Sequence, residues 1–185
     1  VFAESLGFHL AMVGDHVAVT SDINARYPAP FYDPFTTLAW LAGKTGKIEL
    51  GTTVIIVPYR HPALTARMVA GLDQLSGGRF IFGIGAGWST MEFEALGLPF
   101  HQRGAMTDEY LAAMKVLWSD GPATFDGNFT SFKHVLTAPL PVQKPHPPIW
   151  VGGPSDAAIR RPVLHGDAWH PMNAELGWLT DYGLP

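Results

Sequence analysis

Asp15 and His16 form an adjacent carboxylate and imidazole that are suited to proton chemistry. They follow an apolar run of strand length that begins at His9 and stops at Gly14. An imidazole with an ordinary pKa of about 6.5 gives or takes a proton near neutral pH. We therefore interpret His16 as a candidate acid or base and Asp15 as the residue that orients it. The alternative interpretation is a capping aspartate beside a histidine that merely lines a loop.

The segment GIGAGW places glycines at 83, 85 and 87 directly before Trp88. A dinucleotide-binding fingerprint, G-x-G-x-x-G, requires glycine at position 88, so this segment does not match it. Glycines at alternate positions of a strand remove side chains from one face and let a ligand or a neighbouring backbone approach. Gly85 and Gly87 are therefore candidate ligand contacts, or else positions of tight packing. Trp88 either stacks on a ligand or is buried in the core.

A turn at Gly152, Gly153, Pro154 and Ser155 follows an apolar run and opens a helical pattern. Free backbone N–H groups and the helix dipole favour an anion at such a turn, although an ordinary turn capped by Ser155 has the same sequence. The eight histidines show no H-x-x-x-H or H-E-x-x-H spacing, and the chain has no G-x-S-x-G motif. We therefore expect neither a metal site nor a serine nucleophile of that kind.

Alternating strands and helices must position these residues. Apolar, β-branched runs predict strands at 9–17, 48–58, 79–88, 149–153 and 167–171. Apolar residues at helical spacing predict helices at 33–46, 63–78, 104–119 and 155–166, the last interrupted or restarted at Pro162. Strands separated by helices indicate a parallel sheet, either open and doubly wound or part of an eight-stranded barrel. Residues 18–32 are typical of a loop, and Asp126-Gly127 predicts a hairpin within an insertion at about 123–148.

Composition agrees with a buried sheet. The chain has 185 residues, of which 47% are apolar and only 15% charged, compared with about 25% charged in an ordinary soluble domain. The net charge of −4 and the lack of a basic run argue against nucleic acid and membrane as partners. The chain has no cysteine, no apolar run of membrane-spanning length and no signal-peptide pattern. We therefore expect a soluble, cytoplasmic protein.

Five segments in this order resemble the luciferase-like monooxygenases, in particular their branch of deazaflavin (coenzyme F420)-dependent oxidoreductases: VGDHV, LGTTVIIVPYRHPA, GRFIFGIGAGW, EFEALGLPFHQRG and HPPIWVGG. The resemblance covers about residues 3–171 and implies an α/β fold, the (β/α)8 TIM barrel, with a cofactor at the carboxyl ends of the strands. On that map, residues 1–185 form a single partial TIM-barrel domain. It would supply strands two to six, and we expect the first strand and the last two to lie outside it.

The resemblance also implies roles for single residues. His16 would face the reactive ring of the cofactor, and Asp15 would orient His16 or bond to the ring system. A non-prolyl cis peptide at Thr53–Val54 would support the ring from behind. The positions implied to contact the cofactor are Thr53, Val54, Gly85, Gly87, Trp88, Gly152 and Gly153.

One departure from the family bears on the substrate. Deazaflavin-dependent sugar-phosphate dehydrogenases carry a threonine and a lysine after the sixth strand, where this chain has Met172 and Glu175. The resemblance therefore gives little support for a sugar-phosphate substrate.

The expected activity is hydride transfer between coenzyme F420 and a small organic substrate. The cofactor would supply the redox chemistry, and the protein would supply position, a proton donor or acceptor and shelter from water. Two alternatives stay open: an FMN-dependent monooxygenase that uses dioxygen, and a binding fragment without catalysis. The expected partner is a small-molecule substrate, and the full-length protein is expected to be a homodimer.

Overall fold

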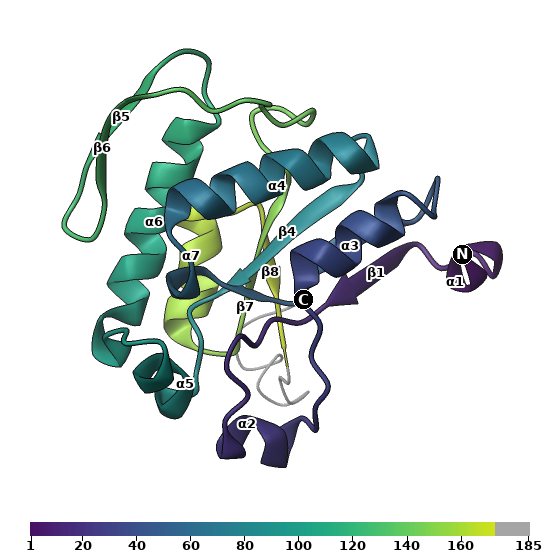
Figure 1. Cartoon of the computed structure of the whole chain (residues 1–185), viewed down its shortest axis with the longest axis horizontal. Helices are drawn as coiled ribbons and strands as arrows, with labels where there is room; N and C mark the ends of the chain where they lie inside the picture. Colours follow the sequence, from purple (N-terminus) through teal and green to yellow (C-terminus); the bar gives the residue numbers. More distant parts are fainter. Residues whose placement is uncertain (173–185) are drawn as a thin grey trace.

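A parallel sheet lies at the centre of the computed structural model, which describes residues 1–172 (Figure 1). Its strand order is β1-β2-β4-β7-β8, and a short strand, β3, also pairs with β4. The strands are β1 (Leu10–Val13), β2 (Glu49–Thr52), β3 (Ile55–Ile56), β4 (Phe80–Gly85), β7 (Ile149–Gly152) and β8 (Ala168–His170). All of these pairings are parallel, so the carboxyl ends of the strands meet at one edge.

The order of the strands distinguishes between the two architectures that the sequence left open. A doubly wound sheet reverses its strand order at a switch point. Here the order follows the chain from β1 to β8 without reversal, as it does in a barrel. Among the described residues the sheet stays open between β1 and β8, so the closed barrel itself is not seen.

Helices α3 (Pro34–Ala42), α4 (Pro62–Ser76), α6 (Arg103–Leu117) and α7 (Asp156–His165) form a row in which each packs against the next. The four predicted helices are therefore present, with two corrections. Helix α3 ends at Ala42, with Gly43 as its C-cap, rather than at Gly46, and α7 runs through Pro162 without interruption. A short helix, α1 (Phe2–Ser5), precedes β1.

Two short helices were not predicted. Helix α2 (Ser21–Arg26) lies in the segment 18–32, which was expected to be a loop, and α5 (Thr90–Ala95) follows β4. Two 3-10 turns, η1 (Val57–Tyr59) and η2 (Phe100–Gln102), complete the connections. Both α2 and α5 lie beyond the carboxyl edge of the sheet, where Figure 1 shows them below the strands.

Apolar side chains from the strands and the helix row make one core. Residues of the central strand β4 are buried on both faces of the sheet, which explains the nearly continuous apolar sequence of this strand. The largest fully buried side chains of the core include Leu38, Leu50, Phe80, Phe82, Ile84, Leu111, Met114 and Ile149.

Polar anchors hold the amino ends of the strands. Arg79, directly before β4, donates hydrogen bonds to the carbonyls of Ile48, Ala42, Thr45 and Ser76 at 2.7–3.3 Å. This guanidinium joins the turn before β2 to the end of α4. The sheet is therefore fixed at the edge opposite the carboxyl ends of its strands.

The predicted hairpin is present as β5 (Ala123–Asp126) and β6 (Ser131–Val135), and it projects beyond α6 in Figure 1. Glu109 of α6 accepts the backbone N–H groups of residues 128, 129 and 130 at 2.7–2.9 Å and so holds the hairpin turn. The connector that follows is tied to α4 through Asp73, which accepts the backbone and side-chain N–H groups of Gln143.

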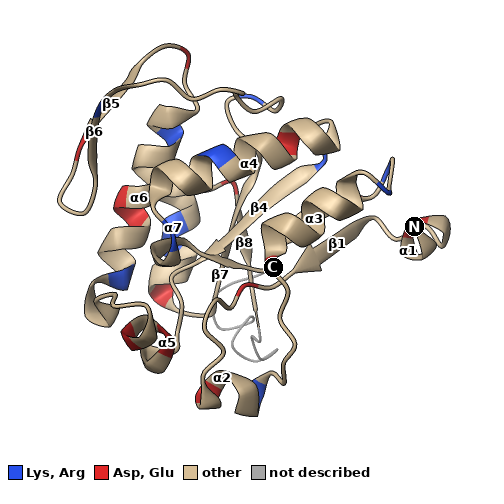
Figure 2. Cartoon of the chain, in the orientation of Figure 1, with Lys and Arg blue, Asp and Glu red and all other residues tan. Residues whose placement is uncertain are grey.

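Charged positions are dispersed over the helices and loops. Figure 2 shows Lys and Arg interspersed with Asp and Glu along the described chain. No helix in the described part of the chain is long and apolar enough to cross a membrane.

Candidate functional site

A cavity of about 880 Å³ lies at the carboxyl ends of the strands. Connections that follow β1, β2, β4 and β7 all contribute to its wall, which is the usual place for a ligand in a parallel α/β fold. All nine residues that the sequence singled out line it: Asp15, His16, Thr53, Val54, Gly85, Gly87, Trp88, Gly152 and Gly153.

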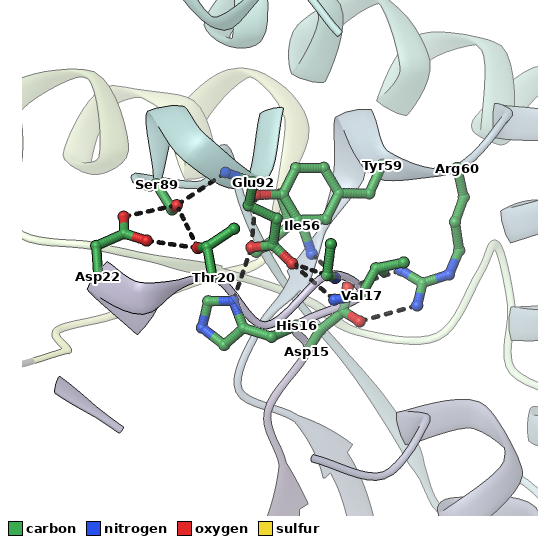
Figure 3. Close-up of polar contacts among 11 residues, drawn as sticks. Asp15, His16, Val17, Thr20, Asp22, Ile56, Tyr59, Arg60, Ser89 and Glu92 are labelled. Carbon is green, nitrogen blue, oxygen red and sulfur yellow. Dashed lines mark hydrogen bonds and ion pairs between the residues drawn. The ribbon is translucent and has the colours of Figure 1, made fainter. Parts of the chain in front are cut away.

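His16 is held by a residue that the sequence interpretation missed. Its Nδ1 lies 2.8 Å from Oε2 of Glu92, which comes from α5 (Figure 3). The imidazole is 9% exposed and the Glu92 side chain is fully buried. Because an ionised carboxylate only accepts hydrogen bonds, Nδ1 must carry the proton of this bond. The other ring nitrogen, Nε2, is then the atom available for proton exchange in the cavity.

Glu92 accepts hydrogen bonds through both of its oxygens. Oε1 accepts the backbone N–H groups of Val17 and Ala18 at 2.7 and 3.0 Å, and Oε2 also accepts the hydroxyl of Tyr59 at 2.9 Å. Burial raises the pKa of Glu92, but the hydrogen bonds from His16, Ala18, Tyr59 and Val17 outweigh that effect and leave the pKa below its ordinary value. Glu92 therefore stays ionised at neutral pH.

Tyr59 stays protonated in this arrangement. Burial, together with the adjacent Glu92 carboxylate, raises the pKa of the Tyr59 hydroxyl far above its ordinary value. The hydroxyl is thus a fixed donor to Glu92. The ring of Tyr59 packs edge-on against Phe93 at 4.9 Å between centroids, which holds it in place from the α5 side.

Asp15 does not contact His16 in the way that the sequence interpretation expected. Its two oxygens accept the Nη1 and Nη2 groups of Arg60 at 2.7 and 2.8 Å, and one of them also accepts the backbone N–H of Ile56. Asp15 is therefore a buried anchor between the β1 loop and η1, and Glu92 is the residue that orients His16. Arg60, which directly follows η1, is therefore a second residue of the site that the sequence analysis did not single out.

The peptide bond between Thr53 and Val54 is cis, as the resemblance implied. It interrupts the predicted strand 48–58 and separates β2 from β3. Thr53 Oγ1 lies 3.0 Å from Nε2 of His170 at the end of β8, so the segment between β2 and β3 is linked to the end of β8.

The alternating glycines of β4 have close neighbours. A Cβ on Gly85 would lie 2.6 Å from Cγ2 of Val54, and a Cβ on Gly87, whose φ is +83°, would lie 2.8 Å from both Ile56 and Phe93. Close packing therefore accounts for the missing side chains. Both glycines also line the cavity, so contact with a bound ring stays a prediction. Trp88 is 40% exposed at the cavity wall, which excludes the alternative of a core tryptophan.

The turn at Gly152 and Gly153 opens α7 beside the cavity. The Ser155 side chain accepts the backbone N–H of Ala158 at 3.2 Å, so the predicted cap is present. A Cβ on Gly152 would lie 3.0 Å from the sulfur of Met172. Glu175, the second residue that departs from the family pattern, lies outside the described residues.

A second polar connection joins α2 to α5. Oδ2 of Asp22 accepts the Ser89 hydroxyl at 2.7 Å, and Oδ1 accepts the hydroxyl of Thr20 (Figure 3). Ser89 also caps α5 by accepting the backbone N–H of Glu92. The connections after β1 and β4 are therefore tied together at two places, once through Glu92 and once through Asp22.

The sequence carried one signal for Glu92. Ser89 and Glu92 have the S-x-x-E spacing of a helix start, directly before the apolar Phe93. This spacing, which the sequence analysis did not use, indicates a helix start at α5. It does not indicate the direction of the Glu92 side chain, which points to His16 instead of the cap. As for metals, the described residues contain no group of three or more His, Asp or Glu side chains placed to hold an ion.

Comparison with known proteins identifies relatives of the chain. The model of the luciferase-like monooxygenase family matches residues 1–178. An uncharacterized protein of Mycobacterium tuberculosis (strain ATCC 25618 / H37Rv) is 35% identical over 190 residues, which cover 96% of this chain and 64% of that protein. The oxygenase component of a flavin-dependent trigonelline monooxygenase from Acinetobacter baylyi (strain ATCC 33305 / BD413 / ADP1) is 36% identical over 165 residues, covering 88% and 42%.

Solved structures share the fold. An F420-dependent secondary alcohol dehydrogenase in complex with an F420-acetone adduct superposes with a TM-score of 0.79 at 26% identity, covering 93% of this chain and 52% of that one. The chain spans less than two thirds of the length of the curated relatives described above. The match over residues 1–178 shows that the chain belongs to the luciferase-like monooxygenase family.

Proposed function

We propose that the protein transfers a hydride between a bound deazaflavin of the F420 type and a small organic substrate. The observation that carries this proposal is the buried pair of His16 and Glu92 at the wall of the cavity. Oxidation of an alcohol to a carbonyl, or the reverse, moves a hydroxyl proton as well as a hydride. A histidine with one nitrogen fixed by a carboxylate and the other available is suited to exchange that proton.

The residues of the cavity fit a flat tricyclic ring. The cavity volume of about 880 Å³ is within the usual range of ligand sites. Gly85 and Gly152 let the Val54 side chain pack closely against β4 and β7 at the wall of this cavity. When bound, the deazaflavin would accept or donate the hydride. The Thr53–Val54 backbone would support the ring, and Gly152 with Gly153 would line its ribityl-phosphate side.

His16 would hold the substrate proton at Nε2. Since Nδ1 donates to Glu92, the neutral imidazole presents Nε2 as an acceptor, and the protonated imidazole presents it as a donor. The burial of Glu92 and its four hydrogen-bond donors would keep the proton on Nδ1 of His16 while Nε2 gains and loses a proton. The F420-dependent secondary alcohol dehydrogenase among the structural neighbours supports this class of reaction.

A second candidate is an FMN-dependent monooxygenase that uses dioxygen. The similarity to the flavin-dependent trigonelline monooxygenase, which covers 88% of this chain, favours it. The cavity suits either ring system, because the two tricyclic rings have the same shape. The distinguishing property is therefore the cofactor that the protein prefers.

Titration of the protein with F420 and with FMN, followed by fluorescence quenching, tests the proposal. We expect F420 to bind more tightly, and we expect little oxygen uptake when the reduced cofactor is supplied. Tighter binding of FMN together with oxygen uptake would favour the monooxygenase. Binding of neither cofactor would leave the non-catalytic alternative.

A further inference from the structure

Tyr59 donates to the same Glu92 oxygen that accepts the hydrogen bond of His16 (Figure 3). Oε2 lies 2.8 Å from Nδ1 of His16 and 2.9 Å from the Tyr59 hydroxyl, whereas Oε1 accepts only backbone N–H groups. A carboxylate oxygen has lone pairs for both donors, and it shares its negative charge between them. The hydroxyl and the imidazole therefore compete for the charge of one oxygen.

A buried carboxylate favours the charged form of a histidine that it contacts. The Glu92 side chain and the His16 ring are both almost completely removed from water, so solvent and salt screen their attraction little. Without other donors, this attraction would favour an imidazolium whose Nε2 can donate a proton but cannot accept one. An acid or base that works in both directions must also release its proton. A second donor on Oε2 weakens the attraction and leaves the carboxylate in place.

The Tyr59 side chain is held in the position that this competition requires. Tyr59 is the last residue of η1, in the connection after β3, and its ring packs edge-on against Phe93 of α5. Three separate connections of the fold thus meet at Glu92: those that carry His16, Tyr59 and Glu92 itself. A phenylalanine at position 59 would keep the ring contact and remove only the hydroxyl.

Other charged and titratable groups surround the pair, and all of them remain when only the Tyr59 hydroxyl is removed. Asp15 is paired with Arg60, and Asp22 accepts the hydroxyls of two neighbouring side chains. The ring of Tyr27 stacks on His16 at 6.5 Å between centroids, and Arg26 lies over the Tyr27 ring. The cavity wall also contains His101, Arg103 and Arg161. A comparison of Tyr59 with phenylalanine therefore isolates the effect of one hydroxyl.

We propose that Tyr59 is a positioning residue that sets how readily His16 takes up and releases its proton, and that it acts through Glu92. Its hydroxyl takes part of the negative charge of Oε2, so His16 is not held permanently as an imidazolium. The inference rests on the proposed function only where it concerns the use of this proton in turnover. The titration of His16 itself can be measured without a substrate.

NMR titration of the ring C–H signals of His16 in the cofactor-loaded protein tests the inference. The variant His16→Gln identifies these signals among those of the eight histidines. In Tyr59→Phe the midpoint of the titration should move to higher pH by about half a unit or more, because loss of one hydrogen bond to a charged group should raise the proton affinity about threefold or more. If His16 is the base in substrate oxidation, the pH at which turnover rises should move upward by the same amount.

Two further variants show where the effect originates. The matched control Tyr110→Phe removes a hydroxyl from a buried tyrosine of α6 that is not part of the cavity wall, and it should leave the midpoint unchanged. Tyr59→Phe is also measured in the Glu92→Gln background. There the loss of the hydroxyl should leave the midpoint almost unchanged, because the negative charge that the hydroxyl shares is already gone.

Three outcomes overturn the inference. They are an unchanged or lower midpoint in Tyr59→Phe, an equal shift in Tyr110→Phe, and an equal shift in the Glu92→Gln background. A lower free energy of unfolding in Tyr59→Phe without a shift of the midpoint would assign Tyr59 a structural role only. A shifted midpoint in a protein that transfers no hydride would refute the proposed function and would still support the action of Tyr59 on His16.

Discussion

Nδ1 of His16 and Oε2 of Glu92 lie 2.8 Å apart although 76 positions separate the two residues in the chain. The bond joins the connection after β1 to the connection after β4. It also decides which nitrogen of His16 faces the cavity, so the chemistry of one loop depends on a carboxylate from another.

Glu92→Gln should lower turnover about 10- to 100-fold, as loss of the carboxylate that orients a functional histidine typically does. The glutamine oxygen can still accept the N–H groups of Val17 and Ala18, but its amide then donates toward His16 and reverses the tautomer. The pH dependence of turnover should change, because Nε2 becomes a donor. Glu94→Gln, an exposed position on the same helix, is the matched control. Unchanged turnover and pH dependence in Glu92→Gln would show that Glu92 does not position His16.

The contribution of Glu92 to stability should depend on pH. The pKa of Glu92 in the folded protein lies below its ordinary value of 4.5. Its stabilisation is therefore present above about pH 4.5 and is lost as the pH falls through the lower folded pKa. Urea unfolding of the wild type and of Glu92→Gln at several pH values measures this. The difference in unfolding free energy should be largest near pH 7 and shrink below pH 4. A constant difference would contradict the assignment of a charged Glu92.

His16→Ala should lower turnover by about 10² to 10⁴, the usual contribution of a positioned acid or base. Cofactor affinity should change much less, since the backbone and the other walls of the cavity remain. Steady-state kinetics and cofactor titration measure the two effects separately. Turnover within about threefold of the wild type would exclude His16 as the acid or base.

Removal of one partner of the Asp15–Arg60 pair should be strongly destabilising. The Asp15 side chain is fully buried and that of Arg60 is 12% exposed, so Arg60→Gln leaves a buried carboxylate without its cation. A loss of about 3–5 kcal/mol is expected. The double variant Asp15→Asn/Arg60→Gln should lose less than the sum of the two single variants, as measured by urea unfolding. Strict additivity of the two losses would show that the pair is not coupled.

Gly85→Ala should disturb the part of the cavity wall where Gly85 packs against Val54. The new Cβ would lie 2.6 Å from Val54 Cγ2, so the Thr53–Val54 segment must shift. We expect a destabilisation of about 1–3 kcal/mol, as for other overpacked sites, together with weaker cofactor binding. The control is Gly71→Ala in α4, where an added Cβ meets nothing within 4 Å and should stabilise the helix by about 0.5–1 kcal/mol. Equal changes in stability and in cofactor affinity in the two variants would show that close packing at Gly85 does not shape the cavity.

Sequence patterns predicted the regular part of the fold well. The five strands and four long helices are present because each repeats an apolar period over enough residues to be distinctive. Their ends were less predictable. The predicted strand 9–17 ends at Val13, because the chain then leaves the sheet and Asp15 accepts hydrogen bonds from Arg60 and the Ile56 N–H. The predicted strand 79–88 stops at Gly85.

The sequence and the resemblance predicted residues that line the cavity, but they did not predict how these residues pair. Most of the residues that surround the cavity follow strand ends, and this location can be derived from the order of strands and helices. Thr53 and Val54 were assigned by the family resemblance alone. The pairing of His16 with Glu92 instead of Asp15 cannot, because it depends on how α5 packs over the connection after β1. Helices α2 and α5 have six residues each, too few for a hydrophobic period to appear.

The hydrogen bonds of Arg79 stabilise the sheet at the edge that lies away from the cavity. The sheet is held at the amino ends of its strands, while the connection after β1 lies at the opposite edge, and residues 24–32 of that connection contain no buried side chain. Directed evolution of new substrate preferences should therefore begin with a library in residues 24–32. Most members are expected to remain folded while the wall around His16 changes shape, so residues 24–32 should be more evolvable than the strands that Arg79 anchors.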